Sequence, residues 1–190
     1  MAEFDENDLK RILKNLSDSK QLAFILLLCE RMMPAFSKFS EDTKFDMSCY
    51  RKSVDIAWAY LAENTNLEQC EQISEACCEC VPDTEEFDHA LTSAALNAAL
   101  AVGSLMAFLS ERNVDRIVEA AGLARDTLAL QVQSVEAAQP LSLTSDELVK
   151  HPLMQQEARR QADDLMFLAS LPDHIGQKEV YLLKARTASL

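Results

Sequence analysis

Glu30 and Arg31 are the residues whose types and setting most directly suggest chemistry, because they are adjacent charges inside an apolar segment. This segment covers residues 22–39 and reads LAFILLLCERMMPAFSKF. Neighbouring helical residues diverge by about 100 degrees around the axis, so the two side chains cannot pair with each other on one helix face. Each charge therefore needs a partner elsewhere in the chain, since a partly buried charge is costly unless it is paired.

Two interpretations of this pair stay open. In the structural one, Glu30 and Arg31 hold the helices together through charged hydrogen bonds to their neighbours. In the functional one, they belong to a ligand-binding or catalytic site, where such charges are used.

A cysteine cluster is the second feature that could do chemistry. Its members are Cys70, Cys77, Cys78 and Cys80, of which Cys77 and Cys80 have the C-x-x-C spacing. Structural zinc needs four ligands, but no second pair exists and His89 is the only histidine nearby. A thioredoxin-like motif would begin a helix after a strand, whereas this one ends a predicted helix. We expect neither a metal nor a cofactor.

Elemental analysis should test this expectation. Protein purified without chelator should carry well under one zinc ion per chain, because the ligand count stops at closely spaced thiols and one histidine. Stoichiometric zinc that disappears in the Cys77→Ser variant would contradict the prediction.

Glu86 and His89 have the Glu-x-x-His spacing of di-iron helical bundles, and the spacing from Glu147 to His151 is one residue longer. A di-iron site needs two true copies of the motif and two further inward glutamates. Because the sequence has one copy, we do not expect such a site. No other arrangement typical of catalysis is visible, so we assign no catalytic residue.

Four glutamates form a predicted acidic face, because they recur every three or four residues: Glu68, Glu71, Glu75 and Glu79. Like charges at these spacings cost about 0.2 to 0.5 kcal/mol per pair, which a solvated helix face tolerates. The face can be plain solvated surface, a docking surface for a basic partner, or a site for divalent cations.

The net charge of -13 is concentrated in one third of the chain. Residues 53–111 contain 11 carboxylates and no Lys or Arg. Such a surface repels phosphate, so we expect neither nucleic acid nor an anionic membrane as partner. The acidic N-terminal decapeptide is unlike a secretory signal, so we expect a cytoplasmic protein whose six cysteines are thiols rather than disulfides.

The composition predicts an all-α fold, since only 3 glycines and 5 prolines occur in 190 residues. Apolar spacing predicts helices near residues 9–16, 18–33, 46–61, 66–81, 89–110, 113–138, 152–171 and 173–186.

Pro34 either kinks the second helix or starts a new one. Thr144 and Glu147 form a capping box. We expect one multihelical domain, 1–190, with a possible linker at 139–143 and an antiparallel bundle at its heart.

The uncharged helix at 89–110 is long enough to cross a bilayer. It is rich in alanine, however, contains several polar residues and has no basic residue before it. We therefore interpret it as a central helix of the bundle, buried on most sides, where Ala94, Ala98 and Ala101 admit close neighbours.

Two segments resemble the bacterial DUF416, or YjaG-like, family of unknown function. The first is the Leu, Cys, Glu, Arg, Met run of residues 22–39 with its proline and two aromatics. The second, residues 143–165, carries matching residues Thr144, Glu147, Leu148, Pro152, Glu157 and Gln161. The resemblance implies an all-helical fold. It adds Glu157 and Gln161 to Glu30 and Arg31 as ligand or partner candidates. Glu157 and Asp163, which lie in the second segment, are candidate partners for Arg31, and Asp55 is a third candidate outside it.

Our leading functional hypothesis is a non-catalytic cytoplasmic protein-interaction module that acts on a protein partner, including itself as a homodimer. The alternative is a small-molecule-binding protein or an enzyme that uses Glu30, Arg31 and nearby carboxylates. A concave pocket containing either residue would favour the alternative, and a flat apolar patch beside the acidic face would favour the first.

Overall fold

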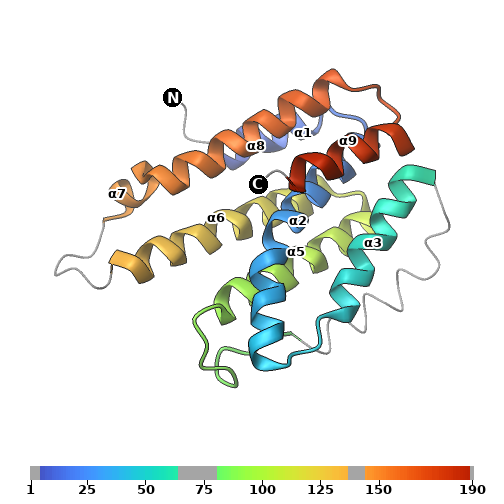
Figure 1. The fold of residues 1–190 in the computed structure, drawn as a ribbon. Coiled ribbons are helices and arrows are strands. Elements are labelled where there is room, and N and C mark those ends of the chain that lie inside the picture. Colours follow the sequence, from blue (N-terminus) through green and yellow to red (C-terminus); the bar gives the residue numbers. More distant parts are fainter. Residues whose placement is uncertain (1–4, 64–80, 137–143, 189–190) are drawn as a thin grey trace.

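The computed structural model describes residues 5–63, 81–136 and 144–188, and all regular secondary structure in these ranges is helical (Figure 1). The helices are α1 (Glu6–Leu13), α2 (Asp18–Thr43), α3 (Ser48–Glu63), α5 (Thr92–Glu111), α6 (Val114–Glu136), α7 (Ser145–Lys150), α8 (Pro152–Ser170) and α9 (Gln177–Ala188). The predicted all-α fold is confirmed. The acidic face, the cysteines from Cys70 to Cys80 and the linker 139–143 lie outside the described residues, and the 1–190 domain boundary stays a prediction.

Helix α2 lies at the centre of the fold, in contact with α3, α5, α6, α8 and α9. Every residue from Lys20 to Cys29 is buried, which follows from the eight consecutive apolar residues in this stretch. Pro34 lies within α2, so it does not start a new helix. The helix ends at Lys44, which has a left-handed backbone and donates its N–H to the carbonyl of Ser40.

Helices α5 and α6 form an antiparallel pair, because only Arg112 and Asn113 separate them. Helix α5 also packs on α2 and α3, as expected for a central helix. Its residues Ala98 and Ala101 are fully buried, whereas Ala94 is half-buried. Within the described residues α5 is the one helix long and apolar enough to pass a length-and-composition test for a membrane span, a test that core helices also pass.

Helices α7, α8 and α9 complete the fold over α2. The capping box is confirmed, since Thr144 accepts from the backbone of Glu147 and the Glu147 carboxylate accepts from the backbone of Thr144. His151 caps α8 and Pro152 is its first residue, so the proline restarts a helix. Both α8 and α9 pack on α2 (Figure 1). Helices α8 and α9 therefore cover the side of α2 that carries Arg31.

Candidate functional site

Arg31 lies in a buried ion-pair network between α2 and α8. Its Nη2 atom donates to Oε1 of Glu157 at 3.3 Å, and its Nη1 atom donates to Oδ2 of Asp164. Only 8% of the Arg31 side chain is exposed, against 5% for Glu157 and 7% for Asp164. The prediction that a carboxylate meets Arg31 is confirmed. Of the three candidates that the sequence left open, Glu157 is the one that pairs with Arg31, and Asp163 and Asp55 do not.

The acceptors on α8 are positioned by helical spacing. Glu157, Gln161 and Asp164 are separated by four and three residues, so their side chains share the face that packs against α2 and α6. Gln161 is fully buried and donates through Nε2 to Oε1 of Glu157 at 2.9 Å and to the carbonyl of Ala121 at 3.4 Å. Asp163 is exposed because one residue rotates a side chain by about 100 degrees.

Asp164 also binds a third helix, through Arg186 of α9. Nη2 of Arg186 donates to Oδ1 of Asp164 at 3.1 Å, and the guanidinium lies 4.6 Å from the centroid of the Phe167 ring. Asp164 thus joins α2 to α9 through two arginines. The sequence analysis missed Asp164 and Arg186. The position of Asp164 seven residues after Glu157, on the same helix face, was the signal that could have identified it.

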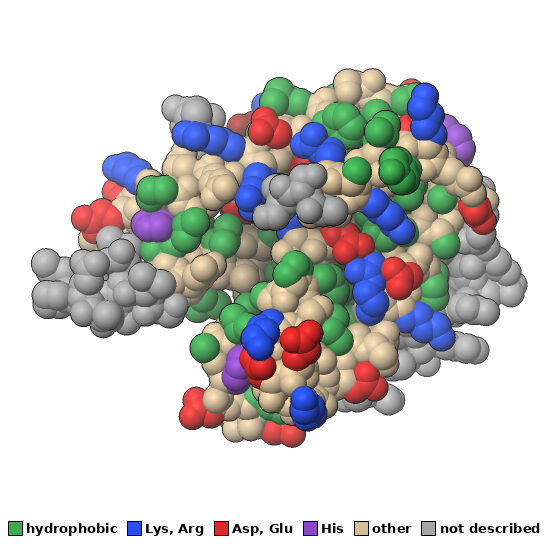
Figure 2. Space-filling view, in the orientation of Figure 1, with side chains coloured by type: hydrophobic (Ala, Val, Ile, Leu, Met, Phe, Trp, Pro, Cys, Tyr) green, Lys and Arg blue, Asp and Glu red, His purple; other side chains and the backbone are tan. Residues whose placement is uncertain are grey.

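A cavity of about 440 Å³ opens beside this network, between α2, α8 and α9. Its charged lining consists of Arg31, Arg160, Asp163, Asp164 and Arg186, and its apolar lining of Leu27, Leu182 and Ala185. Leu182 and Ala185 are exposed, so the cavity reaches solvent on the α9 side. Figure 2 shows basic and acidic side chains next to one another on the face that carries α8 and α9. Glu157 and Gln161 lie behind the cavity and support Arg31.

Glu30 points to a different neighbour, helix α3. Its two carboxylate oxygens accept from Arg51 at 2.8 and 2.9 Å, and Oε1 also accepts from Nε1 of Trp58 at 2.8 Å. Asp55 pairs with the same arginine at 2.7 Å. The expectation that Glu30 and Arg31 have separate partners is confirmed, and both hold helices together. Glu30 does not line the cavity, so the two residues do not form one site.

The environment of Glu30 favours its ionised form. Burial alone would raise the pKa of its carboxyl, but hydrogen bonds from Arg51 and Trp58 and the charges of Arg51 and Lys184 together lower that pKa below the ordinary value of 4.5. Because the folded-state pKa is depressed, ionised Glu30 stabilises the fold above the unfolded-state pKa. This contribution is lost as the pH falls through the folded-state pKa.

We therefore expect Glu30→Gln to reduce stability in a pH-dependent way. At pH 7 the variant should lose about 1.5 to 3 kcal/mol, as expected for hydrogen bonds to a charged group. The difference from wild type should shrink below about pH 4.5, where the wild-type carboxyl also becomes protonated. Urea unfolding at neutral and acidic pH measures both quantities. Glu41→Gln, at an exposed position of the same helix, is the matched control and should match wild type throughout. A deficit that is equal at both pH values would contradict this reasoning.

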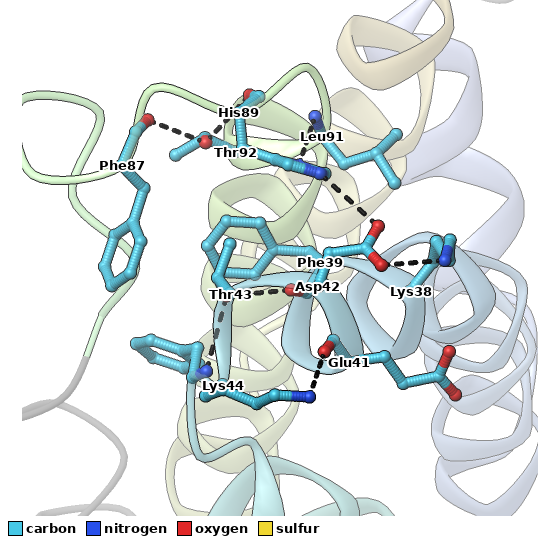
Figure 3. Close-up of polar contacts among 11 residues, drawn as sticks. Lys38, Phe39, Glu41, Asp42, Thr43, Lys44, Phe87, His89, Leu91 and Thr92 are labelled. Atoms are coloured by element: carbon cyan, nitrogen blue, oxygen red, sulfur yellow. Dashed lines mark hydrogen bonds and ion pairs between the residues drawn. The ribbon is translucent and has the colours of Figure 1, made fainter.

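His89 lies between the C-terminal end of α2 and the segment before α5 (Figure 3). Its Nδ1 accepts from the backbone N–H of Leu91 at 3.2 Å, and its Nε2 lies 3.4 Å from Oδ2 of Asp42. Asp42 also accepts from Lys38 at 2.8 Å. Both ring nitrogens are therefore engaged, and Glu86 is exposed. His89 thus makes a structural contact that anchors the start of α5, and the contact does not depend on the spacing from Glu86.

Cys29 is the cysteine of the described residues that faces the core. It is fully buried, and its thiol lies 3.6 Å from the carbonyl of Ala101. Burial and the negative charge of Glu30 raise the pKa of the Cys29 thiol, so it stays protonated and unreactive. No group of three or more His, Cys, Asp or Glu within the described ranges is arranged to hold a metal ion.

The fold and this buried network define an all-α protein whose charged side chains gather between three helices. Its sequence matches the model of the family described as "Protein of unknown function (DUF416)" over residues 8–187, so the chain belongs to that family, as the two family-like segments indicated. It is 27% identical to Uncharacterized protein YjaG of Escherichia coli (strain K12) over 191 residues, which cover 97% of this chain and 92% of that protein. An uncharacterized protein of Haemophilus influenzae is 25% identical over 139 residues, 67% of each chain. A crystal structure of a DUF416 family protein from Shewanella baltica OS155 has the same fold, with a TM-score of 0.83 and 21% identity over all of this chain and 95% of that chain.

Proposed function

We propose that this protein is a non-catalytic binding protein for a small molecule, which it holds in the cavity between α2, α8 and α9. The observation that carries the proposal is the presence of Arg31 in the wall of that cavity, with its guanidinium held in place by Glu157 and Asp164. A volume of about 440 Å³ falls within the range of about 300 to 1,000 Å³ typical of ligand pockets. A mostly preformed site of this kind binds with little loss of conformational entropy.

The lining favours binding over catalysis. Both oxygens of Asp164 accept from arginines, so this carboxylate is not available as a general base. The hydroxyl of Thr187, which also lines the cavity, donates to the carbonyl of Lys184 at 2.8 Å. The described lining therefore lacks a nucleophile beside a base.

The protein-interaction hypothesis has less support. Its acidic face, at residues 68–79, lies outside the described residues. Large apolar side chains are exposed on α8 and α9, among them Met166 and Tyr181, but single exposed apolar residues are common on monomeric proteins. Self-association, a protein partner and the cytoplasmic location stay predictions of the sequence analysis.

Native mass spectrometry tests the proposal. Protein purified gently from its own cells should carry a bound small molecule, and a metabolite panel should contain compounds that raise its melting temperature. Ala185→Trp places a large ring at the mouth of the cavity and should abolish both effects. Ala169→Trp, at an exposed alanine outside the cavity lining, is the matched control and should retain them. A ligand retained equally by both folded variants, or no ligand and no stabilising compound at all, would overturn the proposal.

A further inference from the structure

One arginine of the cavity lining has hydrogen-bond donors that no described residue satisfies. The Nε atoms of Arg31 and Arg186 and the Oε1 atom of Gln161 also lack a partner among the described residues, but all three atoms are too deeply buried to meet a ligand in the cavity. Arg160, half-buried in the same lining, makes no ion pair with any described residue. A partly buried guanidinium without an acceptor keeps a desolvation cost that nothing offsets. The cavity therefore favours a ligand that supplies acceptor atoms.

The charge balance of the site limits the ligand to a low negative charge. Three arginines, Arg31, Arg160 and Arg186, stand against Asp163 and Asp164 in the lining and Glu157 behind it. This set is formally neutral, so a dianion would leave two uncompensated negative charges in a partly buried site, whereas a monoanion leaves one. A single negative charge can use the donors that remain, since Arg160 makes no ion pair within the described part of the chain and Arg186 is fixed by Asp164 and Phe167.

Apart from Thr187, the rest of the lining is apolar. Leu27 is buried one helical turn before Arg31, and Leu182 and Ala185 lie together on the cavity side of α9. These side chains offer a surface to carbon atoms and no hydrogen bonds. A ligand that fills the cavity thus needs an apolar body attached to its charged end.

We propose that the cavity binds a small organic monocarboxylate, whose carboxylate meets Arg160 and Arg186 and whose apolar body lies against Leu27, Leu182 and Ala185. This inference rests on the proposed function, because it names the class of ligand for the same cavity. Arginine suits this task, since its planar guanidinium pairs with a carboxylate through two parallel hydrogen bonds.

Calorimetric titration with four probes of one chain length tests the inference: hexanoate, hexanamide, hexylamine and hexyl phosphate. Hexanoate should bind, and at least about tenfold more tightly than hexanamide, as expected for loss of a charged hydrogen bond. Hexylamine should not bind. Hexyl phosphate should bind more weakly than hexanoate because of its second charge.

Three variants assign the effect to the cavity. Arg160→Gln should weaken hexanoate about tenfold and leave hexanamide unchanged. Arg159→Gln removes the same charge from the neighbouring exposed position outside the lining and should change neither affinity by more than about twofold. Asp163→Asn removes a carboxylate from the cavity lining and should strengthen hexanoate binding severalfold.

The outcomes separate this inference from the proposed function. Equal binding of hexanamide and hexanoate, tighter binding of hexyl phosphate, or equal effects of Arg159→Gln and Arg160→Gln would each reject the monocarboxylate. So would no binding of hexanoate at millimolar concentration. In every one of these cases the small-molecule proposal would still stand if native mass spectrometry found a ligand that Ala185→Trp removes.

Discussion

Replacing Trp58 by alanine should lower the free energy of unfolding by about 3 to 5 kcal/mol, the usual range for deleting a large buried aromatic side chain. Trp58 is 1% exposed and is the largest fully buried side chain of the described residues. The change would leave a cavity between α3 and its neighbours. It would also remove the N–H that donates to Glu30 at 2.8 Å. Chemical unfolding followed by circular dichroism measures the loss, because the variant has no tryptophan to report by fluorescence.

Two further variants divide this effect into its parts. Trp58→Phe keeps most of the ring packing but lacks the donor, so it should lose about 1.5 to 3 kcal/mol. Combined with Glu30→Gln it should cost less than the sum of the single changes, since both remove the same hydrogen bond. Tyr181→Ala, at a side chain 75% exposed, is the control and should change stability by no more than about 0.5 kcal/mol. A Trp58→Ala variant as stable as that control would contradict the core placement, as would red-shifted emission from wild-type Trp58.

The fold could be predicted from the sequence largely because helix formation depends on local spacing. The capping box at Thr144 and the restart at Pro152 are local signals, and both are found in the structure. Pro34 was ambiguous, since a proline is compatible with a helix start, a kink or a position inside a helix that tertiary packing stabilises. The long burial of α2 on both sides of this proline explains why the helix continues.

The site was harder to predict, because its partners come from helices far apart in the chain. That Glu30 and Arg31 needed separate partners followed from helix geometry alone. Which carboxylate meets Arg31 depends on how α8 is rotated about its axis, and one residue changes that direction by about 100 degrees. The candidate Asp163 was therefore wrong by one position, because Arg31 pairs with the next residue, Asp164. Arg51, the partner of Glu30, was missed because nothing in local spacing relates α2 to α3.

The cavity itself has no signal in the sequence. Its walls are ordinary helical residues such as Leu27 and Ala185, and the space arises from the way α8 and α9 lie on α2. Sequence analysis could therefore identify Arg31 as a residue that needs explanation, but not the volume beside it. That volume, together with the unpaired donors, is what moves our preferred interpretation from protein interaction to small-molecule binding.

Arg31→Met should leave a folded protein whose free energy of unfolding is lower by about 3 to 5 kcal/mol at neutral pH, the range for breaking a buried ion pair by removing one partner. Methionine fills much of the arginine volume, so the loss comes mainly from the carboxylates left behind. Among the described residues, Glu157 would keep only the hydrogen bond from Gln161, and Asp164 only its contact with Arg186. Chemical unfolding followed by the emission of Trp58 measures the loss.

A second change tests that this charge imbalance is the cause. In the double variant Arg31→Met, Glu157→Gln, one abandoned charge is gone while the shape is nearly preserved, so about half of the lost stability should return. Glu157→Gln alone should be destabilising, because Arg31 then loses the negative charge of the partner that lies 3.3 Å from its Nη2 atom. The two changes would thus be individually harmful and mutually compensating, which a loss of packing alone does not produce. If the double variant is no more stable than Arg31→Met, the stability contributed by Arg31 comes from the packing of its carbon chain, and the network does not depend on its charge.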